Sequence, residues 1–581
     1  MIKYLNLKTE PTFTLTKNKQ NYVLSNKKVS LTLDDLSYEI FIMLTNNASL
    51  VDIFNHYKKK TLKDDATSKR DVFLFIYTLV NNNIVKNTKT DDIFRKPFEC
   101  CMIEITNTCN FKCPHCYVDK QKPFILTKEN IKNISKDLES LHCHHITLTG
   151  GEPLSHPDFK EIYKYLYENN FLVSLNTNGS MLNEEYISFF EQYPPLSIEV
   201  SLYGTDDKTY YNFTKTQVSF DLLTKNILNL KNKNINVVLK NVLTSSNEEN
   251  FYNIKNFANK LNIPFKSDYL VFPQTFNKSS FNNEQASNDY IIQYLQQQQD
   301  VESYFIALFN KKQSNSLFLC NKNKLSIFIN SHNKVCLCPC MQDFGIDYKK
   351  TELPQIINNI HSLLKKRLSA SSPCYNCTLK PICRYCPGKF FMSTGSLKKP
   401  PEWFCKTSQS IYDKFIKGIK ILPVKEASLQ FLKSCFSILK NNLQNQGFQI
   451  SNNDFKIWMN NIKKSFSSSF WFAIYNNGRF CGFMTLSTVN TKLFVSEIQF
   501  ADSIKNSRAI LKCIEFLTSY KPLSKHKECY FNINNKNTKS LHTFSHLQPE
   551  LISSNSNTSL YILSRQNIQH YLSSKAKNST L

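Results

Sequence analysis

The stretch Met102-Ile-Glu-Ile-Thr-Asn-Thr-Cys109-Asn-Phe-Lys-Cys113-Pro-His-Cys116-Tyr117 joins a short apolar run to three closely spaced cysteines. Three residues separate the first pair of cysteines and two separate the second pair. Three thiolates on one loop can bind three irons of a four-iron cluster and leave the fourth iron open to a small molecule. The sequence therefore predicts a 4Fe-4S cluster on Cys109, Cys113 and Cys116. Zinc is the alternative, but zinc sites usually show paired Cys-x-x-Cys hooks.

Alternating strand and helix patterns surround this motif from residue 96 to residue 310. Strands are predicted at 102–105, 146–148, 172–175, 198–202, 237–242 and 270–272, with helical spacing at 127–140, 157–168, 183–192, 219–231 and 248–261. Strands joined by crossover helices predict a parallel sheet curved into a partial (β/α)6 barrel, whose site lies at the carboxyl ends of the strands. Residues 274–310 are rich in Asn and Gln and are expected to form a polar helix or a connector.

Polar residues after the next three strand candidates complete a pattern. Gly150-Gly151-Glu152-Pro153 follows the second strand, Asn176-Thr177-Asn178-Gly179 ends the third, and Ser201 lies near the end of the fourth. With the cysteines, this order resembles the radical S-adenosylmethionine (SAM) family. The resemblance implies a deoxyadenosyl radical, made by reductive cleavage of SAM, that takes a hydrogen atom from a substrate. It also implies that Tyr117 lies against the adenine and that the turn Gly150, Gly151, Glu152 and Pro153 approaches the methionine moiety. Thr177, Asn178 and Ser201 would approach the carboxylate and the ribose.

A second cysteine group fills residues 311–420. It reads Cys374-x2-Cys377-x5-Cys383-x2-Cys386, followed by Cys405 and preceded by Cys320 and the triplet Cys336, Cys338 and Cys340. Nine thiols are about enough for two clusters, although a structural zinc ribbon is the alternative. The group resembles the SPASM extension of radical enzymes that modify ribosomally made peptides. That resemblance implies two auxiliary 4Fe-4S clusters on Cys320, Cys338, Cys374, Cys377, Cys383, Cys386 and Cys405.

Two departures from the SPASM pattern leave the ligand partition open. Asn333 stands where the family has a glycine, and Asn tolerates a left-handed turn. The spacing between Cys383 and Cys386 also differs from that of the family by one residue. Cys336 or Cys340 is therefore a candidate for an extra ligand.

The flanking segments resemble two further families. Residues 1–95 show short β-runs and then helical spacing, like the winged-helix domain of pyrroloquinoline quinone biosynthesis, which captures a leader peptide by strand addition; a DNA-binding winged helix is the alternative. Residues 421–581 resemble the GNAT acyltransferase fold at 470–500 and at Asn537-x2-Ser540-Leu541-x2-Phe544. Glycine is missing from Ile504 to Leu511, where coenzyme A phosphates would lie, and Phe544 replaces a tyrosine acid, so this domain is expected to be degenerate.

Composition restricts the partners and the compartment. The formal charge of +26 could attract nucleic acid, a membrane or an acidic polypeptide. However, Lys and Asn are abundant and Gly is scarce (11 residues), which indicates a compositional bias of the whole proteome rather than a binding surface. Nucleic acid is therefore not favoured as a partner. Eighteen apolar residues never run together and no signal peptide is recognisable, which predicts a cytoplasmic protein that does not enter a membrane. Nineteen cysteines in a reducing compartment are then thiols for metal rather than disulfides.

Together these segments predict a multidomain α/β enzyme that holds a precursor peptide by its leader and modifies it with a radical. The reaction would be thioether or carbon–carbon crosslinking, oxidation or epimerisation, and a flavodoxin or ferredoxin would supply the electron. The alternatives are a leader-binding or regulatory protein with decayed catalysis, and a radical SAM enzyme that acts on RNA or on a folded protein such as a sulfatase.

Overall fold

The computed structural model describes residues 7–9, 14–18, 21–25, 30–46, 48–62, 68, 71–72, 75–76, 78–79, 84–87, 98–118, 122–141, 143–272, 284–320, 325–426, 428–445, 449–466, 469–490, 492–501, 507–523, 526, 528–534, 545, 547–564 and 566–569. The chain divides into two compact units. The first contains Met1–Ile291, Ser314–Cys377 and Tyr385–Cys405, and the second contains Ile292–Gln313, Thr378–Arg384 and Lys406–Leu581.

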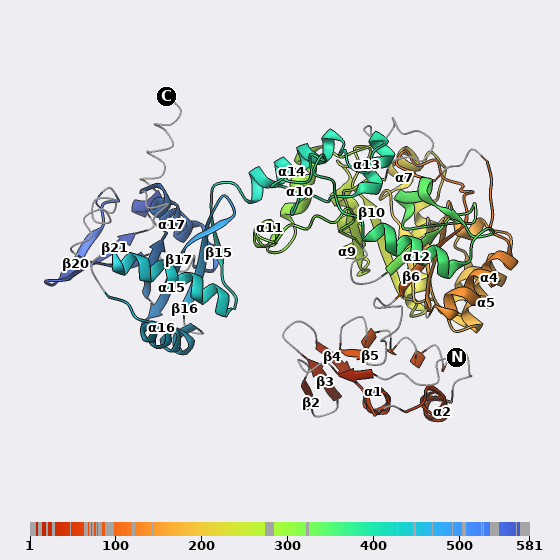
Figure 1. Cartoon of the computed structure of the whole chain (residues 1–581), viewed down its shortest axis with the longest axis horizontal. Helices are drawn as coiled ribbons and strands as arrows, with labels where there is room; N and C mark the ends of the chain where they lie inside the picture. Colours follow the sequence, from red (N-terminus) through yellow and green to blue (C-terminus); the bar gives the residue numbers. More distant parts are fainter. Residues whose placement is uncertain are drawn as a thin grey trace. The chain divides into compact units, whose positions relative to one another are not determined.

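A nine-stranded sheet organises the first unit, in the order β11-β10-β9-β8-β7-β6-β12-β13-β14 (Figure 1). Strands β6 to β12 run parallel to their neighbours, and β13 and β14 are antiparallel. The strands are β6 (Phe98–Thr106), β7 (His145–Gly150), β8 (Leu172–Thr177), β9 (Ser197–Ser201), β10 (Val237–Val242), β11 (Phe265–Asp268), β12 (Leu325–Ile329), β13 (Lys334–Cys336) and β14 (Ile346–Asp347). The sequential order of β6 to β11 is that of the predicted partial barrel.

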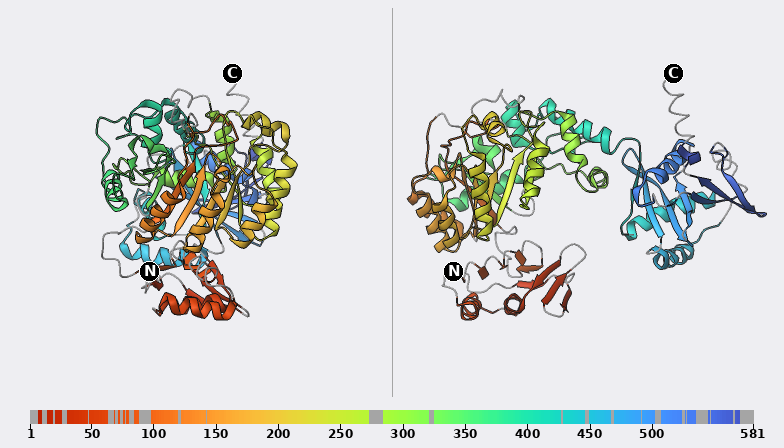
Figure 2. Two further views of the ribbon diagram at one scale, coloured as in Figure 1. Left: turned by 90° about the vertical axis from the view of Figure 1, so that its right-hand side faces the viewer. Right: turned by 180° about the vertical axis from the view of Figure 1, so that it is seen from behind.

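Crossover helices cover one face of this sheet (Figure 2). They are α4 (Lys128–Ser140), α5 (Phe159–Glu168), α6 (Glu184–Gln192), α7 (Asp207–Thr214), α8 (Phe220–Asn232) and α9 (Phe251–Lys260). Each predicted helix lies within two residues or so of an observed one, because apolar residues at helical spacing such as Ile131, Ile134 and Leu138 bury one stripe. Side chains of strand residues such as Ile103, Leu148 and Val200 are buried as well.

Two predictions for the barrel are corrected. The sixth strand was expected at 270–272 but is β11, where Leu239 of β10 pairs with Phe265 and Lys240 pairs with Lys266. The polar residues of β11 concealed the strand, and the apolar residues 270–272 follow its end. Helix α7 was not predicted; its N-cap Asp206 and Thr209 form a reciprocal capping box.

The cysteine-rich segment extends the barrel sheet. Strand β12 pairs in parallel with β6, so that Ile327 lies opposite Cys101. The hairpin that follows is held to the barrel by Glu104 of β6, which accepts hydrogen bonds from the backbone N–H of Ser331 (3.2 Å) and from its hydroxyl (2.7 Å). Asn333 adopts a φ of 60° in this turn, so the tolerance expected of Asn in a left-handed position is confirmed.

Further helices in and around this segment are α12 (Leu353–Leu364), α13 (Pro387–Thr394) and α14 (Glu402–Phe415), with the short 3-10 helices η1 (Pro153–Ser155) and η3 (Pro339–Phe344). The stretch predicted as a polar helix or a connector contains α10 (Asn288–Gln296) and α11 (Val301–Phe309). Helix α11 is apolar rather than polar, and its Phe305 ring stacks on Phe415 with centroids 5.3 Å apart.

The amino-terminal segment contains the predicted strands followed by helices. Strands β2 (Thr14–Asn18), β3 (Asn21–Ser25) and β4 (Ser30–Leu33) form an antiparallel sheet, and β1 (Leu7–Thr9) pairs with β5 (Val85–Asn87). Helices α1 (Asp35–Thr45) and α2 (Leu50–Thr61) begin at the N-caps Asp34 and Ser49. Residues such as Leu24, Ile40 and Ile53 form their own buried core.

The second unit contains a seven-stranded sheet in the order β15-β16-β17-β18-β19-β21-β20. Its strands are β15 (Ile419–Pro423), β16 (Ser469–Asn476), β17 (Arg479–Val489), β18 (Lys492–Phe500), β19 (Glu528–Asn534), β20 (Glu550–Ser554) and β21 (Thr558–Ser564), and its helices are α15 (Leu429–Gln444), α16 (Asn452–Ser465) and α17 (Ser507–Ser519). Five of these strands match strands that the sequence pattern predicts at 470–475, 483–486, 493–500, 529–533 and 560–563, whereas β15 and β20 were not predicted. The residues on which the acyltransferase comparison depends, Ile504–Asn506, Asn537, Ser540, Leu541 and Phe544, lie outside the described residues.

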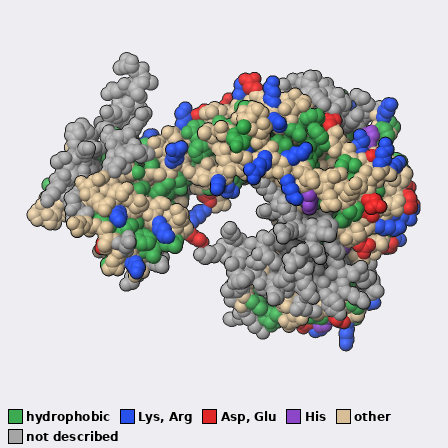
Figure 3. Space-filling model, in the orientation of Figure 1, with side chains coloured by type: hydrophobic (Ala, Val, Ile, Leu, Met, Phe, Trp, Pro, Cys, Tyr) green, Lys and Arg blue, Asp and Glu red, His purple; other side chains and the backbone are tan. Residues whose placement is uncertain are grey.

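The described surface gives little sign of one continuous basic face. In the view of Figure 3, Lys and Arg side chains on the first unit are interspersed with Asp and Glu. Several are paired, as Lys128 is with Glu161 and Lys233 with Glu191. Within the described part of the chain, no helix is both long and apolar enough to span a membrane.

Candidate active site

The loop with Cys109, Cys113 and Cys116 begins where β6 ends, at the carboxyl end of the barrel strands. Its anchor is Phe111, whose side chain is 1% exposed and whose ring meets Tyr210 of α7 edge to face at 6.4 Å. Within the loop, the backbone N–H of Phe111 donates to Cys109 Sγ (3.4 Å) and that of Cys116 to the Cys113 carbonyl (3.2 Å). The buried ring thus fixes the loop while its thiols stay partly exposed.

Helix α7 and the residues after it hold the other side of the loop. The backbone N–H of Lys112 donates to the Thr214 carbonyl (2.8 Å), and the Thr216 hydroxyl donates to the Asn110 carbonyl (3.0 Å). A helix that the sequence did not predict therefore positions the cysteines.

Gly150 and Gly151 are required by the cysteine loop itself. A Cβ at Gly150 would lie 2.4 Å from the Thr106 carbonyl oxygen, and one at Gly151 would lie 2.3 Å from that of Thr108. The two backbones instead form hydrogen bonds of 2.8 Å, from the N–H of Gly151 to Thr106 and from that of Glu152 to Thr108. The glycines were expected to admit the methionine moiety; in the structure their open Cβ positions admit the backbone of residues 106–108.

Glu152 joins the turns after β7 and β8. Its carboxylate is fully buried and accepts hydrogen bonds from the Thr177 hydroxyl (2.7 Å), the Asn178 N–H (2.7 Å) and the Leu154 N–H (3.0 Å). Burial raises the pKa of Glu152 to about 7, although these three donors act against the rise. Oε2 receives one of the three bonds, which leaves it capacity for a further donor.

Asn178 connects β8 to the cysteine loop. Its side-chain amide Nδ2 donates to Asn110 Oδ1 (2.9 Å) and lies 3.8 Å from Cys109 Sγ, while its Oδ1 accepts from the Ser180 hydroxyl (2.7 Å). The amide thus contacts Cys109, a predicted cluster ligand, and the role that the resemblance implies for Asn178 at the carboxylate or ribose stays a prediction. Asn110 and Ser180 were not singled out from sequence, because no short motif marks them.

The remaining predicted cofactor residues lie around this centre. Pro153 is buried at the start of η1, and the Ser201 carbonyl accepts from the Tyr210 hydroxyl (2.9 Å). Tyr117 lies against Phe272, with ring centroids 5.4 Å apart. Burial raises the pKa of Tyr117 well above its ordinary value, and the charges of Glu104, Cys116, Cys340 and Cys338 add to the rise. Tyr117 therefore stands near cysteines of both groups.

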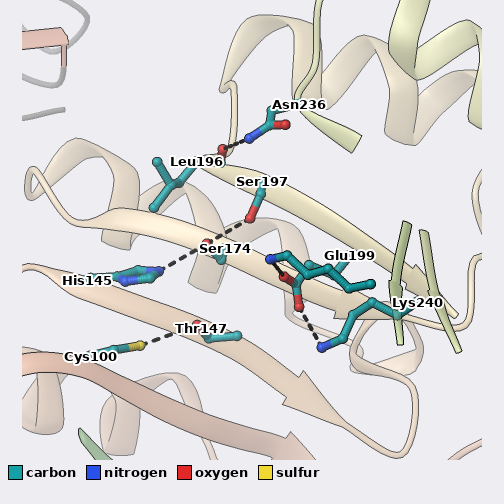
Figure 4. A network of polar contacts seen from close by, with 10 residues as sticks. Cys100, His145, Thr147, Ser174, Leu196, Ser197, Glu199, Asn236 and Lys240 are labelled. Atoms are coloured by element: carbon teal, nitrogen blue, oxygen red, sulfur yellow. Dashed lines mark hydrogen bonds and ion pairs between the residues drawn. The ribbon is translucent and has the colours of Figure 1, made fainter. Parts of the chain in front are cut away.

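A polar face lies opposite the helix-covered face of the sheet (Figure 4). In register across β7, β8 and β9, Thr147 pairs with Ser174 and Ser174 with Ser197. Hydrogen bonds join Cys100 to Thr147 (3.4 Å), His145 to Ser174 (3.0 Å) and Ser197 to Ser174 (3.2 Å). Burial lowers the pKa of His145 to about 4, which makes this histidine neutral near pH 7.

Nearer the carboxyl ends, Glu199 is held by Lys240 (2.6 Å) and Lys266 (2.8 Å). Burial raises the pKa of Glu199, but the two ammonium groups outweigh it and bring the pKa below its ordinary value. Asn176 lies opposite Glu199 in the sheet register, and its Oδ1 is buried with no hydrogen-bond partner among the described residues. A buried acceptor without a partner at the strand ends suits a ligand that brings a donor.

Three segments of the second cysteine group meet in the first unit. On η3, burial raises the pKa of Cys340 well above its ordinary value, and the neighbouring thiols of Cys338 and Cys386 add to the rise. The Cys340 thiol, more than the charge of Lys389, lowers the pKa of Cys386 to about 6, against the effect of burial. Burial raises the pKa of Cys320 to about 11, and the charges of Cys338 and Cys386 contribute. Elsewhere, burial and the charge of Cys377 raise the pKa of Cys405.

These cysteines are not closed around a single ion. Among the described residues, no three His, Cys, Asp or Glu side chains lie close enough together to hold one metal ion. A four-iron cluster has a different requirement, since each thiolate binds a separate iron at a corner of the cluster. Cys374 is buried and Cys377 half-buried in the first unit, while Cys383 lies in Thr378–Arg384 of the second.

Comparisons with known proteins agree with this geometry. Residues 103–260 match the model of the radical SAM superfamily, so the chain contains a radical SAM domain. GTP 3′,8-cyclase of Photorhabdus laumondii is 28% identical over 138 residues, which cover 23% of this chain and 42% of that protein. The subtilosin biosynthesis protein AlbA of Bacillus subtilis is 28% identical over 162 residues, covering 27% and 35%. The chain thus spans less than half of either relative.

Among solved structures, Streptococcus suis SuiB bound to the precursor peptide SuiA aligns with a TM-score of 0.45 and 14% identity. The alignment covers 69% of this chain and all of SuiB.

Proposed function

We propose that this protein is a radical SAM enzyme that modifies a ribosomally synthesised peptide. One observation carries the proposal: the cysteine loop, the Gly150-Gly151-Glu152 turn and the end of β8 form a single hydrogen-bonded unit at the carboxyl ends of neighbouring strands. This is the edge at which barrel enzymes bind their substrates.

The residues present fit a three-thiolate cluster with SAM beside it. Cys109, Cys113 and Cys116 would hold the cluster. The loop that carries them is fixed by the buried Phe111 side chain and by backbone hydrogen bonds, so the three thiols stay partly exposed and can bind iron. Two acceptors near the strand ends, Glu152 Oε2 and Asn176 Oδ1, would receive donors of the methionine amino group or the ribose. When bound, the cluster and SAM supply an electron and a deoxyadenosyl radical.

The protein's own contribution is to orient and enclose. The hydrogen bonds of Glu152 keep the β7 and β8 turns in register with the cysteine loop, so a ligand on either turn is aligned with the cluster. The polar face around Glu199 and Lys240 offers charged and hydrogen-bonding groups to a peptide at the open carboxyl end of the strands. Tyr117 packs against Phe272, and the charges of Cys338 and Cys340 act on its hydroxyl.

The second cysteine group supports two auxiliary clusters, which would accept the electron left on an oxidised peptide. The proximity of Tyr117 to cysteines of both groups supports such a transfer. AlbA is named for the biosynthesis of the bacteriocin subtilosin, whereas GTP 3′,8-cyclase, which is equally 28% identical, is named for a nucleotide. The second cysteine group, which resembles that of peptide-modifying enzymes, is what favours a peptide. A cytoplasmic flavodoxin or ferredoxin would be the donor.

The flanking segments would support this reaction without catalysing it. In the amino-terminal sheet, β2 and β4 are the outer strands among the described ones, and an outer strand can pair with a leader peptide. The seven-stranded sheet of the second unit would be a degenerate GNAT-like module. No single observation favours RNA over peptide.

Release of deoxyadenosine from SAM under dithionite tests the proposal. Cys109→Ala, Cys113→Ala and Cys116→Ala should each abolish release, because a site with two thiolates no longer anchors the cluster. Cys143→Ala is the matched control, since Cys143 is a buried thiol of the same domain that donates to the His145 carbonyl (3.6 Å). Release near the wild-type rate in all three site variants would refute radical SAM chemistry.

A further inference from the structure

The triplet Cys336, Cys338 and Cys340 offers more thiols than the SPASM pattern uses, and the structure distinguishes among them. Strand β13 ends at Cys336, and η3 begins at Pro339, so the chain changes course between Cys336 and Cys340. Both thiols are buried, at 1% and 3% exposed. They nevertheless have different neighbours.

Cys340 faces the segment that begins with Cys386. A Cβ at Gly388 would lie 2.8 Å from Cys340 Cβ and 3.1 Å from the Cys340 carbonyl oxygen. Only a glycine allows this approach, and it brings the start of α13 directly against Cys340. The backbone of Gly388 and Lys389 also donates to the Cys386 sulfur, in the manner of N–H groups that support cluster thiolates.

Cys336 faces away, into the hairpin. Its thiol donates to the Lys334 carbonyl (3.7 Å), and its residue pairs with Phe328 of β12. A Cβ at Gly345 would lie 2.7 Å from Cys336 Sγ, so the turn after η3 closes over this sulfur. Cys336 is thus a packing residue of the hairpin.

Building on the auxiliary clusters of the proposed function, we propose that Cys340 is the fourth protein ligand of the auxiliary cluster that holds Cys386, and that Cys336 binds no iron. The close approach of Gly388 to Cys340 places this residue against the start of the segment that carries Cys386. A cluster with four protein thiolates has no open iron, so it transfers electrons and does not bind substrate.

The test compares Cys340→Ala with Cys336→Ala in the full-length protein, reconstituted anaerobically with iron and sulfide. Iron content and electron paramagnetic resonance are measured without substrate. Wild type should carry about twelve irons, four for each of three clusters. Cys336→Ala should have the iron content of wild type, whereas Cys340→Ala should lose about one to four irons. If only the iron bound by Cys340 is lost, the resonance spectrum should show an oxidised three-iron cluster. Cys340→Ser tests the same position with a weaker oxygen ligand and a smaller change in volume, and should shift the midpoint potential of one cluster.

The outcomes separate this inference from its basis. Retention of about eight irons and of deoxyadenosine release by Cys340→Ala would show that the rest of the protein is folded, and would support the assignment. Twelve irons in both Cys340 variants with unchanged spectra, or loss confined to Cys336→Ala, would overturn the ligand assignment alone. About four irons in wild type would overturn the auxiliary clusters themselves, and the inference with them.

Discussion

Gly151→Ala tests whether the glycine pair exists to admit the cysteine loop. The added Cβ would lie 2.3 Å from the Thr108 carbonyl oxygen, 2.6 Å from its carbon and 2.7 Å from the Asn107 oxygen. All three are backbone atoms, so no side chain can rotate away. The backbone preceding Cys109 must therefore move by about 1 Å to restore ordinary contact, and overpacking of this kind costs about 1–3 kcal/mol.

The effect on chemistry should exceed the effect on stability. A displacement of about 1 Å near reacting groups can cost about a hundredfold in rate, and the movement here falls on residues 107 and 108, next to the first cluster ligand. We expect deoxyadenosine release to fall by about two orders of magnitude while most of the iron is retained. The assay is deoxyadenosine release under dithionite, with iron content and melting temperature measured on the same preparation.

Gly395→Ala is the control. Gly395 has a φ of 73°, so alanine there strains the backbone by about 1–2 kcal/mol, but its Cβ would meet no atom within 4 Å. This variant should melt lower and release deoxyadenosine at the wild-type rate. Wild-type release by Gly151→Ala, or an equal loss in both variants, would refute the steric argument.

Three further predictions address charge and hydrogen bonding. Burial raises the pKa of Glu152 from its ordinary value of 4.5 to about 7, so the wild-type protein loses stability as the pH rises between these two values. The melting temperature of Glu152→Gln, measured relative to wild type, should therefore rise from about pH 5 to pH 8. A difference that stays constant with pH would contradict this. Asn178→Ala removes a donor 3.8 Å from Cys109 Sγ and should lower the midpoint potential of the SAM-binding cluster by roughly tens of millivolts in a redox titration, whereas Asn169→Ala at the exposed C-cap of α5 should not. Lys389→Met removes a buried ammonium whose charge acts on Cys386, and should lower an auxiliary potential by roughly tens of millivolts, because a positive charge nearby favours the reduced cluster; an unchanged potential would place Lys389 outside the cluster's field.

The sequence predicted those parts of the barrel in which one periodic pattern dominates. Strand β10 was predicted at its observed bounds, because its first three residues are apolar and a helix flanks it on each side. Strand β11 was misplaced, because Phe265-Lys-Ser-Asp268 alternates between a packed face and a polar face and looks like a loop beside the apolar residues that follow. Helix α7 was missed because its apolar residues are few, yet Tyr210 and Thr214 position the cysteine loop.

The site residues show a similar limit. The spacing of Cys109, Cys113 and Cys116 is local and could be recognised directly, whereas the contacts that support them come from distant positions. Asn178 reaches Asn110 across 68 residues, and the Thr216 hydroxyl reaches the Asn110 carbonyl across 106. Such contacts depend on the parallel order of the strands, which brings the carboxyl ends together, and no motif in the sequence records them.

The choice between Cys336 and Cys340 depends on the same kind of information. On a continued strand, residues 336, 338 and 340 would share one face, and all three thiols would be equivalent. Pro339 cannot donate a ladder hydrogen bond, and with η3 starting there the strand is replaced by a tight turn that redirects Cys340 toward Gly388. Pro339 therefore separates Cys336, which packs in the hairpin, from Cys340, which lies toward the segment of Cys386. Cys340 can lie there only because Gly388, 49 residues beyond Pro339, has no side chain in that space.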